Sequence, residues 1–414
     1  MKLQSCKKLE CGRCEKPEDT IARLEAVIGR KHDYWIHEEQ VAEHLHWSAM
    51  FIEGMDFRSM GKGITPLYSK AGALAEGAEW LTSRPVEKLP GYLCAHQDEL
   101  DNTLKIESLL EHVASVTSAT LTEIKDLPCS QHWVDGYSLM HNRPLKVPIE
   151  YVDFISGPNG KAAGNRLEEA IVHATNEVFE RRAHITVLKN RMVVPTIDMA
   201  TIENPIVLEH IDFLRGKGIE ITIKDLSFGG HLPCIAAYFE DTTIPKEYQF
   251  HHFFKVGASF NREEALIRTF TEYAQGRKLD EFIDGSKSEQ DRILNHDFRS
   301  LKSQPDTCDN FMSTFMFGFV PYRNADFFKQ GELVPFDKGE CFDDCLDDIA
   351  RARQVCEMLD RDYIIVDFTD PDIAFPVVQA IIPGYSDVLP FHPHDSHGLF
   401  KRWTRSEVLA SYTK

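Results

Sequence analysis

Oxygen-bearing side chains recur along this chain in three pairs whose members lie three residues apart. Positions i and i+3 share one face of a helix, so each pair would point in one direction. Crowded carboxylates repel phosphate, but they are ligands that Mg²⁺ uses when it bridges a protein to a polyphosphate. The pattern therefore indicates nucleotide chemistry. The pairs are Glu76 with Glu79, Glu177 with Glu180, and Glu272 with Gln275.

A glycine-containing segment precedes each pair, and we expect each segment to be a turn that runs into a helix. In the first segment Lys62 lies between two glycines, where its ammonium group and neighbouring backbone N–H groups would cradle a phosphate. Gly61 and Gly257 each lie fifteen residues before the glutamate of their pair, which suggests one reused element. The segments are Gly61-Lys62-Gly63, Asn159 to Gly164, and Gly257.

The helices that must carry these pairs have similar start signals. Thr65-Pro66 places a capping hydroxyl before a proline at the first helical position. Asn165 and Asn261 each precede a glutamate by three residues, close to the capping-box pattern. Short runs rich in β-branched residues alternate with the helices and predict strands, which indicates an α/β or α+β protein. These runs are Ile219–Asp225, Cys234–Phe239, Tyr363–Phe368 and Pro376–Ile382.

A structural alternative exists for each acidic helix. Glu177 falls on the same stripe as Ala170 and Ala174, where a carboxylate is costly unless it is paired or binds a cation. An ion pair with Arg181 or Arg182 would satisfy it without any nucleotide. The recurrence of the same spacing on three similarly capped helices favours cation binding over this alternative.

Composition restricts the partners and the compartment. The formal net charge is −19, which argues against nucleic acid as a partner because a phosphate backbone requires a basic surface. The first residues lack the apolar run of a signal peptide, and no stretch approaches the roughly 18 apolar residues that span a membrane. We therefore expect a cytoplasmic protein, with no membrane contact, whose ten cysteines are mostly reduced thiols or metal ligands.

We expect three regions along the chain: a cysteine-containing extension over residues 1–35, a catalytic domain over 36–400 and a tail over 401–414. Cys6, Cys11 and Cys14 have metal-ligand spacing, but three ligands are one short of a closed zinc or iron–sulfur site. The segment could bind Zn or Fe–S with a fourth ligand, such as Cys94 or a residue of a second subunit. It could instead relay a persulfide, or be a disordered tail. For Cys341 and Cys345, at the start of a helix expected over 341–359, simple packing is favoured.

The sequence resembles the YcaO family, whose members use ATP to activate a peptide backbone amide, because the segments typical of that family occur in it together. The resemblance spans roughly residues 50 to 390. The segments that carry it are Gly61–Pro66 and Ala73–Glu79, Asn159–Gly164 and Glu177–Arg181, Val256–Phe260, Glu264–Arg268 and Thr271–Arg277, and Asp367–Thr369 and Val377–Gly384. Gly72, Pro158 and Arg182 depart from the family pattern, each by removing a polar or acidic group near the nucleotide.

The resemblance implies an α+β, YcaO-like ATP-binding fold of repeated strand–helix lobes around a central nucleotide site. ATP and Mg²⁺ are the implied cofactors. Glu177, Glu272 and Arg277 are the implied catalytic residues. The implied Mg²⁺ ligands are Glu76, Glu79, Glu177, Glu180 and Glu272, and the implied nucleotide contacts are Lys62, Gly63, Glu76, Asn159, Gln275 and Arg277.

The resemblance also implies the substrate and the reaction type. We expect a peptide or protein substrate, a homodimer, and an enzyme that installs a thioamide. The chain ends Ala410-Ser-Tyr-Thr-Lys414 rather than in the proline-rich form of azoline-forming members. No fused ubiquitin-activating-like domain is evident either, so a separate sulfur-donor or TfuA-like partner protein is implied. Azoline formation and a non-catalytic ATP-binding scaffold for peptides are the alternatives.

Overall fold

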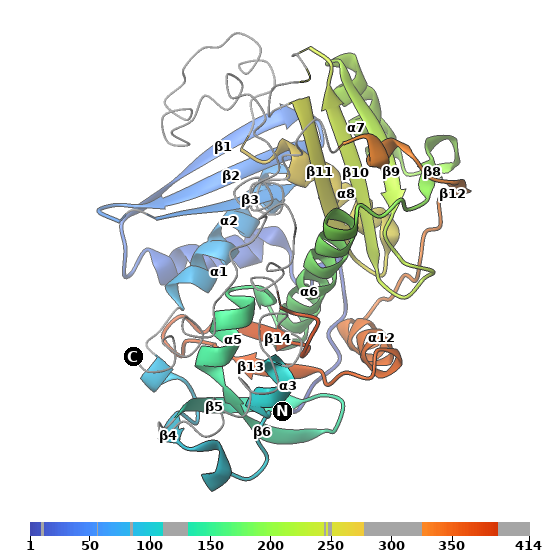
Figure 1. Cartoon of the computed structure of the whole chain (residues 1–414). Coiled ribbons are helices and arrows are strands. Elements are labelled where there is room, and N and C mark those ends of the chain that lie inside the picture. Colours follow the sequence, from blue (N-terminus) through green and yellow to red (C-terminus); the bar gives the residue numbers. More distant parts are fainter. Residues whose placement is uncertain are drawn as a thin grey trace. The chain divides into compact units, whose positions relative to one another are not determined.

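A computed structural model describes residues 1–9, 12–55, 57–82, 86–110, 131–243, 246, 251–276 and 325–387 (Figure 1). The chain divides into two compact units, each assembled from separate segments. Unit 1 combines Met1–Cys14, Ala78–Arg182 and Phe342–Lys414, and unit 2 combines Glu15–Gly77 and Ala183–Cys341. Two of the four points at which the chain passes from one unit to the other fall inside helices, α2 (Pro66–Leu81) and α6 (Leu167–Asn190).

Unit 2 contains a three-stranded antiparallel sheet, in which β1 (Tyr34–Ala42), β2 (Leu45–Ile52) and β3 (Arg58–Gly63) follow one another. The central strand β2 is buried along almost its whole length. Helix α2 packs on this sheet through buried serines: the Ser48 hydroxyl lies 2.8 Å from that of Ser69, and the Ser59 hydroxyl donates to the Ala73 carbonyl at 2.8 Å. Helix α1 (Pro17–Ile28) precedes the sheet and begins at a proline in its first turn.

A five-stranded sheet forms the rest of unit 2, in the order β11-β10-β9-β8-β12. Its strands β8 (Thr196–Asp198), β9 (Ile219–Asp225), β10 (Cys234–Asp241) and β11 (His252–Ala258) pair antiparallel, while β12 (Leu333–Pro335) lies parallel to β8. Helices α7 (Pro205–Gly216) and α8 (Arg262–Ala274) pack on each other and on this sheet (Figure 1). The buried side chains between them include Ile211, Leu214, Ile223, Phe239, Phe253, Phe270 and Tyr273.

Unit 1 contains a six-stranded sheet. Strands β4 (Leu93–Ala95), β5 (Gln131–Ser138), β13 (Ile364–Asp367), β14 (Val377–Ile381) and β7 (Lys161–Ala163) follow in this order, and β6 (Arg143–Pro148) pairs with β5. Strands β13 and β14 are almost fully buried, as their continuous apolar sequences require. Helices α3 (Ile106–Leu110), α5 (Ile149–Ser156) and α12 (Cys345–Met358) complete the unit together with the first part of α6.

The mixture of sheet and helix confirms the α+β class, and the strands expected from sequence are present. Ile219–Asp225 is strand β9 without a change of bounds, and the other three expected strands differ from the observed ones by one or two residues at an end. The expected helix over 341–359 begins later, at Cys345. Asp344 caps it by accepting the Leu346 N–H at 3.0 Å, and Cys341 therefore lies outside it.

Of the three glycine segments expected to be turns, only the middle one contains a turn, at Asn159-Gly160, where Gly160 has φ of +75°. Gly61, Lys62 and Gly63 belong to strand β3, and Gly257 belongs to β11. A Cβ on Gly61 would lie 2.1 Å from the Ala73 nitrogen, and one on Gly257 would lie 2.2 Å from the Ala265 carbonyl oxygen. A Cβ on Gly164 would likewise lie 2.4 Å from the Ala170 nitrogen. In each repeat, glycine thus lets a strand segment approach the following helix at backbone distance.

Helix starts were predicted with mixed success. Thr65 accepts the Tyr68 N–H at 3.3 Å, and Asn261 accepts the Glu263 N–H at 3.2 Å, so these two caps are confirmed. The cap expected at Asn165 is wrong: α6 begins at Leu167, and the Asn165 amide groups donate to the Glu169 carboxylate at 3.1 and 3.4 Å. The first helical hydrogen bond runs from the Ala170 N–H to the Arg166 carbonyl, so the cap position falls on Arg166, one residue later than expected.

The three regions expected along the chain stay a prediction. Described residues before Glu15 belong to unit 1 and helix α1 to unit 2, so the stretch 1–35 contributes to both. Residues 401–414 lie outside the described part of the chain.

Candidate functional site

Glu272 on α8 is the predicted site residue with the most definite surroundings. The Lys62 ammonium group at the end of β3 forms an ion pair with its Oε2, and the Lys255 Nζ of β11 lies 3.5 Å from its Oε1. The Glu272 side chain is 30% exposed and that of Lys255 only 11%. All three residues belong to unit 2, so the structure brings Lys62 and Glu272 together as one charged cluster.

Gln275 does not share a helical face with Glu272 as expected. Helix α8 ends at Ala274, and Gln275 is its C-cap with extended backbone angles. Gly276 follows with φ of +74°, a conformation that suits glycine and ends the helix. The i, i+3 argument therefore fails for this pair. Arg277, the third predicted catalytic residue, lies outside the described part of the chain.

Glu76 and Glu79 lie three residues apart on α2, which confirms the helical spacing of the first pair. The Glu76 Oε2 accepts the Met60 backbone N–H of β3 at 3.3 Å, so this carboxylate lies against the strand that carries Lys62. Gly63 ends the same strand, with Tyr68 packed where its Cβ would be.

Unit 1 carries the second acidic pair, on the part of α6 that precedes Ala183. Both Glu177 and Glu180 are half-buried. The Arg181 Nε lies 3.8 Å from the Glu177 Oε1, one helical turn away, so the ion pair considered as the structural alternative is present. At this length and at 31% exposure of Glu177 the pair contributes little, about 0.5 kcal/mol or less, and leaves room for a stronger ligand.

Asn159 occupies a buried turn between α5 and β7. Its Nδ2 donates to the Ser386 carbonyl at 2.7 Å, and the Gln379 amide donates to its backbone oxygen at 3.1 Å. Its Oδ1 is buried without a hydrogen-bond partner among the described residues. Such an orphaned acceptor is costly in a folded protein and is typical of a position that receives a donor from a ligand or a water molecule.

Two lysines near the acidic groups were missed by sequence reasoning. One is Lys255, described above, and the other is Lys161 of β7. Burial lowers the pKa of Lys161, while the carboxylates of Glu79 and Asp153 oppose that shift. The available signal was the recurrence itself: one lysine lies beside the glycine segment of each repeat, at positions 62, 161 and 255.

Arg182, one of the departures from the family pattern, is accommodated within unit 1. Its guanidinium lies 4.9 Å from the centre of the Tyr385 ring. Burial raises the pKa of Asp387 to about 6, and the positive charge of Arg182 opposes that rise. The arginine thus has an aromatic ring and a carboxyl group of its own unit to interact with.

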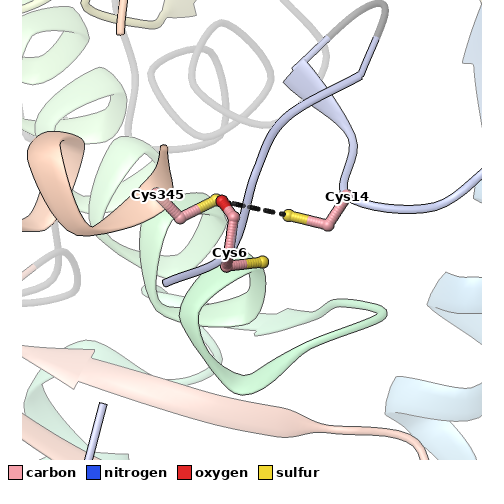
Figure 2. A group of neighbouring side chains, drawn as sticks. All are labelled: Cys6, Cys14 and Cys345. Atoms are coloured by element: carbon pink, nitrogen blue, oxygen red, sulfur yellow. Dashed lines mark hydrogen bonds between the residues drawn. The ribbon is translucent and has the colours of Figure 1, made fainter. Parts of the chain in front are cut away.

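Three thiols converge at the amino-terminal end of unit 1 (Figure 2). The sulfur atoms of Cys6, Cys14 and Cys345 all lie within 4.8 Å of one another. Figure 2 shows the thiols of Cys14 and Cys345 pointing toward each other, with a sulfur–sulfur distance of 3.4 Å. Burial raises the pKa of Cys6 to about 12. Cys345 is thus buried beside two other thiols, and simple packing stays the prediction that the sequence makes for it.

The membership of this group differs from the expected one. Cys345 comes from α12, more than 300 residues after Cys14, and is a ligand candidate from elsewhere in the chain that sequence analysis did not name for this group. Cys11 lies outside the described residues, and Cys94 is exposed on β4 and is not part of the group. Cys341 lies near Asn261 instead, whose Nδ2 is 3.6 Å from its sulfur.

A second group of possible metal ligands, Glu240, His251 and His252, lies in unit 2. The two ring nitrogens of His252 lie 2.6 Å from the Tyr238 hydroxyl and 3.1 Å from the Lys246 carbonyl. Glu240 forms a 2.6 Å ion pair with Lys329. These ligand atoms already have partners within the protein, so the group is explained without a metal.

The family model described as YcaO cyclodehydratase, ATP- and Mg²⁺-binding, matches residues 60–386. This match covers all three acidic repeats and most of the chain. The chain belongs to the YcaO family. Since the family is defined as binding ATP and Mg²⁺, the two cofactors expected from the resemblance are confirmed.

YcaO-family relatives and structures agree with this assignment. A protein of Methanothermobacter thermautotrophicus is 26% identical over 344 residues, which make up 78% of this chain and 80% of the relative. A solved heterocyclase in complex with substrate and cofactor superposes with a TM-score of 0.70 at 20% identity, covering 93% of this chain and about half, 54%, of that chain. YcaO from Methanopyrus kandleri, bound with AMPPCP and Mg²⁺, gives a TM-score of 0.62 at 17% identity, covering 92% of this chain and 95% of that one. The fold is therefore that of YcaO proteins.

The predicted site residues are distributed over both units. Lys62, Gly63, Glu76, Glu272 and Gln275 lie in unit 2, and Glu79, Asn159, Glu177 and Glu180 lie in unit 1. Among the residues that the structure describes, no helix has the length and hydropathy needed to cross a bilayer.

Proposed function

We propose that this YcaO protein uses ATP and Mg²⁺ to activate a backbone amide of a peptide or protein for attack by a sulfur nucleophile, which gives a thioamide. The observation that carries the proposal is the Glu272 carboxylate, set between the ammonium groups of Lys62 and Lys255. Because these paired charges remain partly exposed, the lysines can pair with an arriving polyphosphate while the carboxylate binds its cation.

The residues present fit both cofactors. Carboxylate oxygens at positions 76, 79, 177, 180 and 272 are the hard ligands that Mg²⁺ prefers. The orphaned Asn159 Oδ1 can accept a hydrogen bond from a donor of the nucleotide. Bound ATP supplies the phosphoryl group that turns the amide oxygen into a leaving group, and Mg²⁺ neutralises the phosphate charge.

The protein's own residues bind and position in this scheme. Lys62 and Lys255 lie on neighbouring secondary-structure elements of unit 2, where their ammonium groups stabilise phosphate oxygens electrostatically. Glu272 in unit 2 and Glu177 in unit 1 are each assigned as a Mg²⁺ ligand, a role that would help to orient the phosphate chain. We also assign this activity to the cytoplasm, where ATP is available and thiols stay reduced.

A sulfur nucleophile is favoured by the three thiols at positions 6, 14 and 345, which lie in the unit that also carries Glu177. Addition of hydrosulfide to the amide carbon forms a carbon–sulfur bond and an oxyanion. Phosphorylation of that oxyanion, cleavage of the carbon–oxygen bond and loss of a proton give the thioamide, ADP and phosphate. A homodimer, and a separate sulfur-donor or TfuA-like protein, remain predictions.

Mass spectrometry of a candidate substrate peptide, incubated with the protein, ATP, Mg²⁺ and sulfide, tests the proposal. A thioamide adds the mass difference between sulfur and oxygen, and the gain should require ATP and disappear in Glu177→Gln. Glu150→Gln, a matched change on α5 of the same unit that removes only an ion pair with His132, should retain it. Loss of one water without added sulfur would identify the azoline-forming alternative.

The scaffold alternative is separated by phosphate release. An enzyme of either kind releases phosphate in proportion to the added substrate peptide, whereas a peptide-docking scaffold binds ATP and releases none. ATP binding without substrate-dependent phosphate release, across all substrates found to bind, would contradict the proposed activity.

A further inference from the structure

The three thiols come from two segments that are far apart in the chain. Cys6 and Cys14 belong to the amino-terminal segment, and Cys345 is the first residue of α12. Cys6 and Cys345 are buried, whereas Cys14 is half-buried, so Cys14 is the member of the group that retains some contact with solvent. All three belong to unit 1, so their arrangement is that of one compact body.

Hydrogen bonds fix the backbone at each of the three positions independently of the sulfur atoms. The Cys6 N–H donates to the Asp344 carboxylate and the Cys345 N–H to the Cys6 carbonyl, both at 3.0 Å. The Cys14 N–H donates to the buried Glu169 carboxylate at 3.4 Å. The thiols are therefore held together by the surrounding polar network, as the ligands of a prearranged site are.

Ion pairs with α12 and with the residue before it also hold the amino-terminal segment in place. Lys8 pairs with Asp348 at 2.9 Å, with both side chains largely buried, and Lys7 pairs with Asp344 at 3.4 Å. Gln4 donates its N–H to Glu168 at 2.6 Å. Burying acidic side chains costs free energy. Three thiols that only pack against one another would not require these buried ion pairs and hydrogen bonds.

The sulfur spacing is that of ligands around one metal ion. Thiolates bound tetrahedrally to zinc at about 2.3 Å stand roughly 3.8 Å apart, and the three sulfur atoms here lie within 3.4 to 4.8 Å of one another. An iron–sulfur cluster distributes its thiolates over different iron atoms and needs a wider spacing. A disulfide between Cys14 and Cys345 would use two thiols and leave the third without a role.

We propose that Cys6, Cys14 and Cys345 bind a single zinc-class ion through three thiolates, and that the fourth coordination position, for which the described residues supply no further thiolate, is open beside Cys14. Binding releases the three thiol protons to solvent and transfers no electrons. An open position on a soft ion takes a small anion such as hydrosulfide.

This use of the open position rests on the proposed function, whereas the metal site itself does not. Glu169, which holds Cys14, lies eight residues before Glu177 on α6, which corresponds to about 12 Å along the helix axis. A sulfide-binding ion held by Cys14 would thus lie beside α6, the helix that also carries the predicted Mg²⁺ ligand Glu177. A purely structural ion would fasten the amino-terminal segment to α12.

Metal analysis of the full chain, purified under reducing conditions without chelator, tests the site. We expect near-stoichiometric zinc in the wild type and a loss of most of it in Cys14→Ser, which is chosen because Cys14 is only half-buried. Cys94→Ser and Cys341→Ser remove exposed thiols and should retain the metal. Wild-type protein with no more zinc than Cys14→Ser, or with a Cys14–Cys345 disulfide in place of metal, would overturn the proposal.

Cobalt provides a readout that does not depend on activity. Wild-type protein loaded with Co²⁺ should show the sulfur-to-cobalt charge-transfer absorption, and Cys14→Ser should bind Co²⁺ roughly tenfold or more weakly. Circular dichroism verifies that the variant is folded. Added sulfide should shift the absorption of the wild type, whereas an unchanged spectrum contradicts the open position.

Failure of this inference and failure of the proposed function give different results. If the metal site is wrong, zinc is absent while ATP-dependent modification of the peptide continues. If the proposed function is wrong, zinc and the cobalt spectrum are unchanged while no peptide is modified.

Discussion

At the scale of single residues, Glu272 shows how the same charges can stabilise the folded chain and bind a ligand. Its carboxylate contacts lysines from β3 and β11, and each of these ion pairs is partly exposed. Pairs of this kind contribute at most about 1 kcal/mol to stability because solvent screens them. Their loss should therefore affect nucleotide chemistry far more than folding.

Glu272→Gln should reduce substrate-dependent ATP turnover by roughly 100-fold or more, because a neutral amide is a poor Mg²⁺ ligand and leaves phosphate charge uncompensated. Its thermal unfolding temperature should change by only a few degrees. Glu263→Gln on the same helix, which removes an ion pair with Lys338, is the matched control and should keep its turnover. Equal turnover in the two variants would exclude Glu272 from the site.

Lys62→Ala should raise the concentration of ATP needed for half-saturation about tenfold or more, the typical effect of losing one charged hydrogen bond. Lys255→Ala should act in the same direction if both ammonium groups reach the phosphate chain. Lys62→Arg should rescue only in part, since a planar guanidinium does not reproduce a point charge. Calorimetric titration with a non-hydrolysable ATP analogue measures each affinity.

Lys70→Ala provides the control for the lysine variants. Lys70 lies on α2 and pairs with Glu25 at 2.9 Å, so its removal costs a comparable ion pair elsewhere in the protein. If Lys70→Ala weakened binding of the ATP analogue as much as Lys62→Ala, the loss of affinity would reflect a general electrostatic effect and not a specific contact of Lys62.

At the scale of elements, the strand–helix repeat depends on glycine for close contact rather than for turning. The Cβ that Gly257 lacks would overlap the Ala265 carbonyl and the Thr269 hydroxyl of α8. Glu272 and Lys255 lie on these same two elements, so the distance between β11 and α8 also sets the distance between their charges.

Gly257→Ala should destabilise the protein by about 3 kcal/mol or more, because the overlapping atom is backbone and β11 must move away from α8. Gly216→Ala, at the end of α7, has open space around the added methyl group and should be neutral or stabilising by up to about 1 kcal/mol. Thermal unfolding of the two variants measures the difference. Similar unfolding temperatures would show that β11 tolerates the methyl group.

Sequence patterns anticipated the elements better than their contacts. β9 and the caps at Thr65 and Asn261 follow from local residue chemistry, and they were predicted with little error. Lys255 was missed because it interrupts a buried strand, where periodicity alone gives no hint of its partner. Cys345 was missed as a partner of Cys14 because only the tertiary fold brings these thiols together.

At the scale of the whole molecule, unit 2 contains buried histidines whose titration links folding to pH. Burial lowers the pKa of His210 to about 4, with His44 adding to the effect, while its hydrogen bond to the His44 carbonyl and the charge of Glu209 oppose the shift. In the unfolded chain the group has its ordinary pKa of 6.5. The unfolded state therefore binds the proton first as pH falls.

Stability should accordingly be complete above pH 6.5 and decline as the pH falls toward 4, by about 3 kcal/mol from this residue. His210→Gln cannot be protonated and should flatten the decline. His141→Gln replaces an exposed histidine of unit 1 and should leave the wild-type slope unchanged. Unfolding temperatures measured between pH 4 and pH 7 for the three proteins test the expectation, and parallel curves for all three would refute it.

Several acidic residues have a specific structural or proposed binding role within their own unit. Asp344, Asp348, Glu168 and Glu169 fix the amino-terminal segment, and the helix glutamates at positions 76, 79, 177, 180 and 272 are assigned to the cation.

The pairing of Cys14 with Cys345 also sets an order of events during synthesis. Ribosomes add about 5 to 20 residues per second, so the amino-terminal thiols emerge tens of seconds before α12 is available to receive them. For that interval Cys6 and Cys14 are accessible to oxidants and to free metal ions. Cys6 and Cys14 therefore stay without their partner thiol until the chain has been extended as far as Cys345.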